Sequence, residues 1–237
     1  MAQYVFIHGP GAGGCADSFV HQLKHFPGSV APNLPGHLSG SPCSNIPRYS
    51  EWLRGWLWGQ GYRQDLVLVG FTLGACIALQ YALDYPEEVK ALVLMTIAMR
   101  PKERRPGTLE FRLKAAEDPQ VYRQWKDAMA HTMMFMEPDL RDHLLECHDK
   151  VGPISQHRDL VIIDQFDVRD RIATLQPPLL LIRGVDDPGK PPEYELEIHQ
   201  AVPGSQYLKL DQAGHFPMAE RPHDVNRAIA SFLANLP

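Results

Sequence analysis

Apolar runs and helix-like segments alternate at both ends of the chain. A short apolar run predicts a strand, whereas apolar residues spaced three to four apart predict a helix. The pattern predicts strands at Tyr4–His8, Ser29–Leu34, Asp65–Gly70, Val89–Met95, Leu179–Arg183 and Gln206–Leu210. It predicts helices at Ser18–Phe26, Tyr49–Gly59, Leu73–Tyr85 and Asp224–Leu236.

The apolar run at Asp65–Gly70 decides the type of sheet. Every residue after Asp65 is apolar, as expected for a strand that is buried on both faces. Such strands occur in parallel sheets, and the alternation with helices predicts βαβ units. We therefore predict the α/β fold class, with a mostly parallel sheet that has helices on both faces.

The middle of the chain breaks this alternation. Residues 97–171 are charged and rich in methionine and aromatic side chains, and they are too many for a simple connection between strands. We interpret them as an inserted helical lid that ends before Pro177 and Pro178. Residues 1–96 and 172–237 are then the α/β core.

Composition narrows the classes of partner. The chain is 44% hydrophobic and 22% charged, and its net charge of −5 favours neither nucleic acid nor an anionic membrane. No apolar stretch reaches the roughly 20 residues of a membrane span, and we expect no signal peptide. The four cysteines include no C-x-x-C pair, so we expect a reduced, cytoplasmic protein without metal or cofactor. A small-molecule substrate is the expected partner, and the sequence does not indicate an oligomeric state.

The segment Gly70-Phe71-Thr72-Leu73-Gly74 carries the first chemical signal. It lies between a predicted strand and a predicted helix, with glycine at both ends and a hydroxyl side chain at its centre. This is the layout of a nucleophile elbow, G-x-S-x-G, with threonine in place of serine.

Four further segments accompany the elbow. His8-Gly9 opens a glycine-rich loop, "NLPGHLSGS" starts at Asn33, and "LLLIRGVDDP" and "LDQAGHFP" lie near the C-terminus. Together with the elbow, these segments resemble the α/β-hydrolase superfamily over nearly the whole core. The resemblance places the first strand at the third strand of the full fold, which implies a sheet of about six strands.

The resemblance also implies a catalytic triad in the order nucleophile, acid, base. Thr72, Asp187 and His215 fit that order, and each follows a predicted strand. The family's G-x-x-D pattern selects Asp187 rather than Asp186. In this interpretation His215 takes a proton from Thr72, and Asp187 orients the imidazole.

The expected oxyanion hole and pocket follow from the same resemblance. The backbone N–H of Leu73 is one donor, and the loop at Pro10 and Gly11 should supply the other. Pro10 has no N–H, so Gly11 is the expected donor in that loop. Phe71, Met133 and Phe216 are the candidate substrate-binding residues.

Threonine at the elbow leaves three functions open. The first is a hydrolase of small, largely apolar esters or related acyl substrates, slow because the β-branched residue is strained there and crowds the site. The second is a lyase or cofactor-free oxygenase that uses the His–Asp pair without an acyl intermediate. The third is a non-catalytic protein that binds a ligand in the same pocket.

Overall fold

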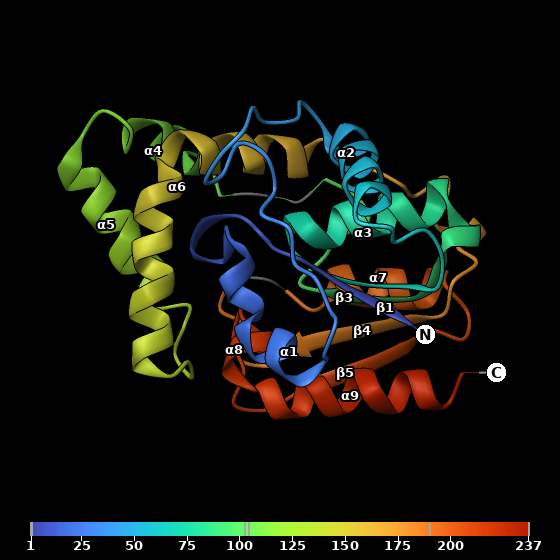
Figure 1. Cartoon of the computed structure of the whole chain (residues 1–237). Helices are drawn as coiled ribbons and strands as arrows, with labels where there is room; N and C mark the ends of the chain where they lie inside the picture. The colour runs from blue at the N-terminus through green and yellow to red at the C-terminus, as the bar shows by residue number, and fades with distance from the viewer. Residues whose placement is uncertain (1, 102, 104, 190, 237) are drawn as a thin grey trace.

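Five parallel strands form the centre of the molecule in the computed structural model, which describes residues 2–236 except 102, 104 and 190 (Figure 1). The ends of the predicted core, residues 1 and 237, lie outside the described residues. The strands lie side by side in chain order, and each pairs in parallel with the next. They are β1 (Gln3–Ile7), β2 (Leu66–Phe71), β3 (Val89–Met95), β4 (Leu179–Gly184) and β5 (Gln206–Leu210).

The prediction of about six strands is one strand too many for the described residues. The segment 29–34 makes only a single parallel bridge, between Val30 and Val5 at the edge of β1. Pro32 and Pro35 flank the rest of this segment, and proline cannot donate a hydrogen bond to a neighbouring strand. The chain therefore leaves the sheet edge after one bridge.

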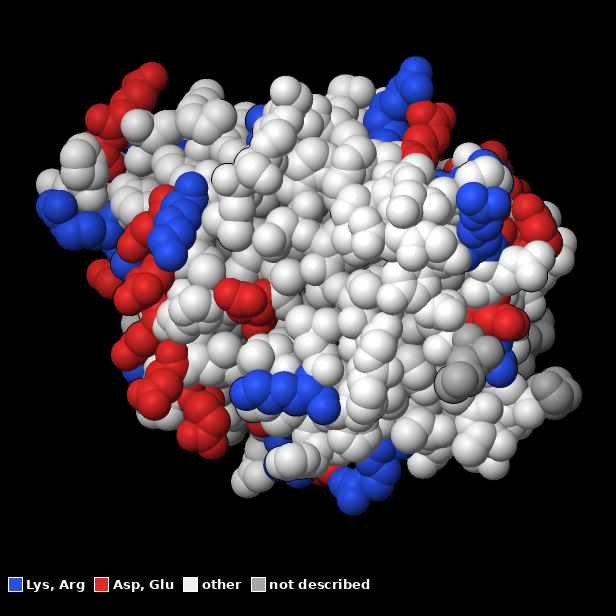
Figure 2. Space-filling model, viewed as in Figure 1, with Lys and Arg blue, Asp and Glu red and all other residues white. Residues whose placement is uncertain are grey.

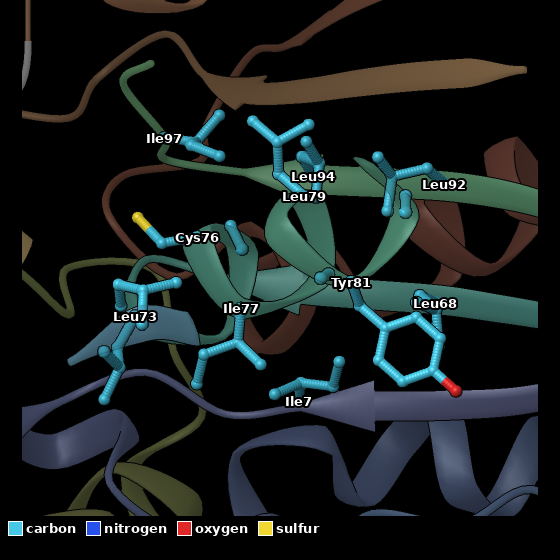
Figure 3. Close-up of a cluster of buried hydrophobic side chains, with 14 of the residues drawn as sticks. Ile7, Leu68, Leu73, Cys76, Ile77, Leu79, Tyr81, Leu92, Leu94 and Ile97 are labelled. Carbon is cyan, nitrogen blue, oxygen red and sulfur yellow. The ribbon is translucent and has the colours of Figure 1, made fainter. Parts of the chain in front are cut away.

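Alternating side chains of the buried strands supply two hydrophobic layers. Leu66 and Leu68 of β2 face one layer, whereas Val67, Val69 and Phe71 face the other. The first layer packs against α2 (Ile46–Gly59), α3 (Leu73–Asp84) and α7 (Glu193–Ala201), as Figure 3 shows for α3. The second layer packs against α1 (Val20–His25), α8 (Pro217–Glu220) and α9 (Pro222–Ala234). The predicted helices on both faces of the sheet are thus confirmed.

Local chemistry moves some helix ends from their predicted positions. Helix α2 begins at Ile46 rather than Tyr49, because the Asn45 side chain accepts a hydrogen bond from the Arg48 N–H at 2.9 Å. The predicted helix Ser18–Phe26 divides into a 3₁₀ turn, Ala16–Phe19, followed by α1.

Three helices occupy the middle of the chain: α4 (Thr108–Lys114), α5 (Pro119–Ala130) and α6 (Pro138–Asp164). Figure 1 places α5 and the first half of α6 beyond the end of the sheet toward which β4 runs. The two ends of this inserted segment lie next to each other, because the Val168 N–H donates to the Met99 carbonyl at 2.8 Å.

Helix α6 is kinked at Gly152, which has φ 74° and ψ 165° and precedes Pro153. Proline removes a helical N–H and disfavours the helical conformation of the residue before it. Beyond the kink, Leu160, Ile162 and Ile163 belong to the same hydrophobic layer as α2 and α3. The second half of α6 is therefore part of the core packing. No helix in the described part of the chain is long and apolar enough to cross a membrane.

Candidate active site

The elbow at Thr72 connects β2 to α3 through a strained backbone. Thr72 has φ 47° and ψ −106°, which is costly for a β-branched residue. Its N–H donates to the Met95 carbonyl at 3.1 Å, and its own carbonyl accepts from the Cys76 N–H at 3.0 Å. A Cβ atom on Gly74 would lie 2.0 Å from the Ile7 carbonyl oxygen, so only glycine lets α3 approach β1 this closely.

The Thr72 hydroxyl faces the loop after β1. A Cβ atom built on Gly9 would lie 2.2 Å from Thr72 Oγ1, so this oxygen occupies the space beside Gly9. Thr72 is buried, and its Oγ1 has no hydrogen-bond partner among the described residues. The hydroxyl therefore makes no hydrogen bond to His215 in this structure, although both residues line the same pocket.

His215 and Asp187 form a hydrogen-bonded pair at the ends of β5 and β4. His215 Nδ1 donates to Asp187 Oδ2 at 2.8 Å, which leaves Nε2 as the nitrogen that can accept a proton. Asp187 Oδ1 accepts a hydrogen bond from the Gly189 N–H at 2.8 Å, and the Asp187 side chain is only 3% exposed. Asp186 is exposed and its N–H donates to the Ala213 carbonyl, so Asp187 is the neighbour that orients the imidazole.

Two segments offer backbone donors near Thr72. Leu73 is the first residue of α3, where N–H groups have no partner within the helix and the helix dipole favours negative charge. Gly11 has φ 68° and begins the 3₁₀ turn Gly11–Gly13, which the Gly14 N–H closes by donating to the Gly11 carbonyl. Pro10 lies between Gly9 and Gly11 and has no N–H to donate.

His8 holds the loop after β1 in place through two hydrogen bonds. Its Nδ1 donates to the Gly9 carbonyl at 2.9 Å, and its Nε2 accepts from the Leu34 N–H at 2.8 Å. Complete burial, with a smaller effect of nearby His37, lowers the His8 pKa to about 3. The neutral ring is therefore the form that holds the loop.

A small pocket of about 190 Å³ opens above the elbow. Its lining includes residues of the elbow, the loop after β1 and the His215 segment: Thr72, Pro10, Gly11, His215 and Phe216. The other lining residues are Arg112, Met129, Thr132, Leu160, Ile163 and Gly189. Of the three candidate substrate-binding residues, Phe216 lines this pocket. Phe71 packs against the His215 ring, with the centroids 5.4 Å apart, and Met133 is buried in the second hydrophobic layer.

Comparison of the sequence with models of protein families identifies the family of this chain. A family model described as the alpha/beta hydrolase family matches residues 4–228, which is nearly the whole chain. The chain belongs to the alpha/beta hydrolase family. The predicted membership of the α/β-hydrolase superfamily is thus confirmed.

Named relatives in this family are hydrolases of several kinds. A protein of Klebsiella pneumoniae (strain 342) named "Putative carbamate hydrolase RutD" is 32% identical over 155 residues, 62% of this chain and 58% of its own length. The 2-hydroxy-6-oxo-6-phenylhexa-2,4-dienoate hydrolase of Burkholderia cepacia is 27% identical over 184 residues, 71% of this chain and 62% of its own. The match thus spans less than two thirds of either relative.

Solved structures agree with the fold over a longer range. A thermophilic esterase from Thermogutta terrifontis has a TM-score of 0.80 and 22% sequence identity, over 99% of this chain and 90% of its own. A bromoperoxidase from Bacillus anthracis has a TM-score of 0.84 and 18% identity, over 99% and 92% of the two chains. At these identities the likeness shows the alpha/beta hydrolase fold.

Sequence patterns missed several residues at this alpha/beta hydrolase site. Arg112, Met129 and Thr132 reach the pocket from the inserted segment, whose helices carry no family motif. Glu220 was also missed, although it follows His215 by only five residues. Its Oε2 accepts from the N–H groups of Gly214 and Phe216 on either side of His215, at 2.7 and 3.2 Å. A carboxylate one turn into the helix after the histidine is the signal that could have identified it.

Proposed function

We propose that this protein is a hydrolase of small, largely apolar esters or related acyl substrates, with Thr72 as nucleophile, His215 as base and Asp187 as the acid that orients it. The observation that supports this proposal is the 2.8 Å His215–Asp187 hydrogen bond in the same pocket as the Thr72 elbow. The alpha/beta hydrolase family and the esterase fold neighbours agree with it.

In this mechanism, the Thr72 hydroxyl first turns from Gly9 toward the pocket. His215 Nε2 takes its proton while Oγ1 attacks the acyl carbon, and Asp187 stabilises the resulting imidazolium. The N–H groups of Leu73 and Gly11 stabilise the tetrahedral oxyanion. His215 then gives its proton to the leaving alcohol, and an acyl-threonine remains. Water that His215 deprotonates hydrolyses this ester and restores Thr72.

The pocket suggests the size and polarity of the substrate. Its 190 Å³ is below the range of roughly 300–1,000 Å³ that is usual for sites of drug-sized ligands. Met129, Leu160, Ile163 and Phe216 make most of its wall apolar, with Arg112 and Thr132 as polar groups. A short acyl chain fits these walls. We also propose that the inserted segment, predicted at residues 97–171, acts as the lid over this pocket through its part before the α6 kink, since the part beyond the kink packs in the core.

Hydrolysis of short p-nitrophenyl esters tests the proposal. We expect His215→Ala to reduce kcat/KM by about 10⁴-fold or more, since the loss of a triad member costs about 10⁴–10⁶-fold. Thr72→Ser should raise kcat about tenfold or more, because serine keeps the hydroxyl without the strained β-branch. Ester hydrolysis that does not change in His215→Ala would contradict the proposal.

A second candidate function is supported by the orientation of the Thr72 hydroxyl. Because Oγ1 faces Gly9 and has no hydrogen-bond partner among the described residues, His215 could act as a base directly on a substrate. Lyase or cofactor-free oxygenase chemistry would then proceed without an acyl intermediate. Such an activity would survive Thr72→Val and disappear in His215→Ala. Ligand binding without turnover, unaffected by His215→Ala, would instead indicate a non-catalytic protein.

A further inference from the structure

Four side chains of metal-binding type meet at a place away from the pocket. Cys15 and Asp17 follow the turn Gly11–Gly13, whereas His143 and Cys147 lie one turn apart on the first half of α6. Ligand atoms of Cys15, Asp17 and Cys147 all lie within 4.8 Å of one another. His143 Nε2 is 2.8 Å from Asp17 Oδ2 and 3.8 Å from Cys147 Sγ. Two segments that are far apart in the sequence thus bring two thiols, an imidazole and a carboxylate together.

These separations are close to those of a tetrahedral zinc site. Metal–ligand bonds of about 2.0–2.3 Å at tetrahedral angles place neighbouring ligand atoms about 3.3–3.8 Å apart. The Cys147–His143 separation of 3.8 Å lies within that range. The shorter Asp17–His143 contact is a hydrogen bond, which a metal ion between the two atoms would replace. His143 stands outside the group of three whose ligand atoms all lie within 4.8 Å of one another, so its ring must also move toward Cys15 to complete the site.

The four ligands differ in burial in a way that suits metal entry from solvent. Cys15 and Cys147 are 1% and 4% exposed, whereas the side chains of Asp17 and His143 are 55% and 45% exposed. The cysteine loop is held in place, since Ser18 Oγ donates to the Cys15 carbonyl and the Ala16 N–H donates to Asn33 Oδ1. An ion could reach the thiols past the two outer ligands without unfolding the loop.

The surface around α6 is negatively charged. Figure 2 shows acidic side chains gathered along the edge of the molecule where Figure 1 places the first half of α6. The exposed carboxylates of this segment are Glu137, Asp139, Asp142, Glu146 and Asp149. A surface of this sign raises the local concentration of cations.

We propose that Cys15, Asp17, His143 and Cys147 bind one zinc ion, which ties the first half of α6 to the loop beside Gly11. On binding, each thiol releases a proton to solvent and coordinates as a thiolate, with no change of oxidation state. Four protein ligands make a closed, structural type of site. The proposal departs from the sequence prediction of no metal. The signal that could have indicated it is the i, i+4 spacing of His143 and Cys147 on one helix face.

Cobalt substitution tests the site directly. The full chain, reduced and freed of metal, is titrated with Co²⁺, and absorption is recorded. We expect one equivalent to produce thiolate-to-cobalt charge-transfer absorption and intense visible bands of tetrahedral Co²⁺, and Zn²⁺ to displace both. Because each thiol must lose its proton to coordinate the ion, affinity should rise from pH 6.5 to pH 8.5.

Matched variants separate this site from other thiols. Cys15→Ser and Cys147→Ser should each weaken the charge-transfer absorption, and the double variant should lose it. Cys43→Ser, on the half-buried cysteine outside the cluster, should keep it. His143→Ala changes an exposed side chain, so it should remain folded by circular dichroism and bind Co²⁺ more weakly.

Three results would overturn the proposal. The first is a wild-type protein that shows no charge-transfer absorption at saturating Co²⁺. The second is absorption that persists in the Cys15→Ser, Cys147→Ser double variant or disappears in Cys43→Ser. The third is a Cys15–Cys147 disulfide whose reduction gives no metal uptake. None of these readouts depends on ester hydrolysis, so they test zinc binding separately from the proposed function.

Discussion

At the scale of single residues, Gly9 and Thr72 share one small space. The Thr72 hydroxyl fills the position where any other residue at 9 would place its Cβ atom. A serine at 72 could leave this space by rotating about χ1 with less restriction, because it lacks the γ-methyl group. The substitution at the elbow and the glycine opposite it therefore act together on the position of the nucleophile.

We predict that Gly9→Ala disrupts this arrangement. The new Cβ would lie 2.2 Å from Thr72 Oγ1 and 2.6 Å from the Phe71 ring, so the loop must shift. The free energy of unfolding should fall by about 1–3 kcal/mol, as for other overpacked sites, and the hydrolysis of p-nitrophenyl esters should fall with it. Urea denaturation and initial rates measure the two effects.

The matched control for this variant is Gly55→Ala. Gly55 lies within α2, and a Cβ there would meet nothing within 4 Å, so alanine should stabilise the helix by up to about 1 kcal/mol. Equal stability of Gly9→Ala and the wild type would show that the space beside Thr72 can expand.

The buried His8 predicts a loss of stability in mild acid. Its pKa is about 3 in the folded chain and near 6.5 when unfolded, so the unfolded state binds the proton more tightly. This contribution is fully present above pH 6.5 and is lost as the pH falls below it, by about 1.4 kcal/mol per pH unit. Urea denaturation at several values between pH 7.5 and 5.5 measures the slope.

The variant that checks the assignment is His8→Gln. It should be less stable at pH 7.5, yet its loss of stability between pH 7.5 and pH 5.5 should be smaller by about 1.4 kcal/mol in total. His25→Gln, at an exposed position, should keep the wild-type slope. An unchanged slope in His8→Gln would assign the acid sensitivity to other groups.

At the scale of elements, the segment between β5 and α8 is held by one carboxylate. Glu220 Oε2 accepts from the N–H groups of Gly214 and Phe216, and its Oε1 accepts from the N–H of Phe135 at 3.3 Å. Burial raises the Glu220 pKa despite these three bonds. Glu220 thus connects the His215 segment to the inserted segment, without touching the pocket itself.

We predict that Glu220→Gln loosens the His215 segment. Glutamine has one acceptor oxygen, so at least one backbone N–H loses its partner, and the free energy of unfolding should fall by about 1–3 kcal/mol. Misplacement of the imidazole should lower kcat more than it raises KM for ester hydrolysis. Glu197→Gln is the control, since the half-exposed Glu197–Arg100 pair should contribute less than about 1 kcal/mol. Wild-type kcat in Glu220→Gln would exclude a positioning role.

At the scale of the whole molecule, the architecture was accessible from the sequence. The alternation of apolar strand runs with helix-like segments is a local pattern, and so is the order of Thr72, Asp187 and His215. These patterns predicted the α/β sheet and its helices. Strand ends also predicted that the three side chains lie at one edge of the sheet. The His215–Asp187 bond needed only a choice between two adjacent aspartates, and the G-x-x-D spacing supplied it.

Features that depend on packing between distant segments could not be predicted from the sequence. The edge position of Val30 depends on prolines that leave it a single bridge to β1. Met129, rather than Met133, lines the pocket, because α5 ends at Ala130 and the chain turns before it reaches Met133. The orientation of the Thr72 hydroxyl depends on Gly9, which is 63 positions away in the chain. No local pattern encodes these contacts.

The kink at Gly152 divides α6 into two halves that should differ in how well they tolerate substitution. Beyond the kink, Leu160, Ile162 and Ile163 are enclosed by α2 and α3, so polar replacements there should be purged in any descendant. Before the kink, the exposed acidic positions face solvent and should tolerate replacement, whereas Leu144, His148 and Val151 are buried and should not. A single helix would then contain two segments with different tolerance to substitution, separated at Gly152.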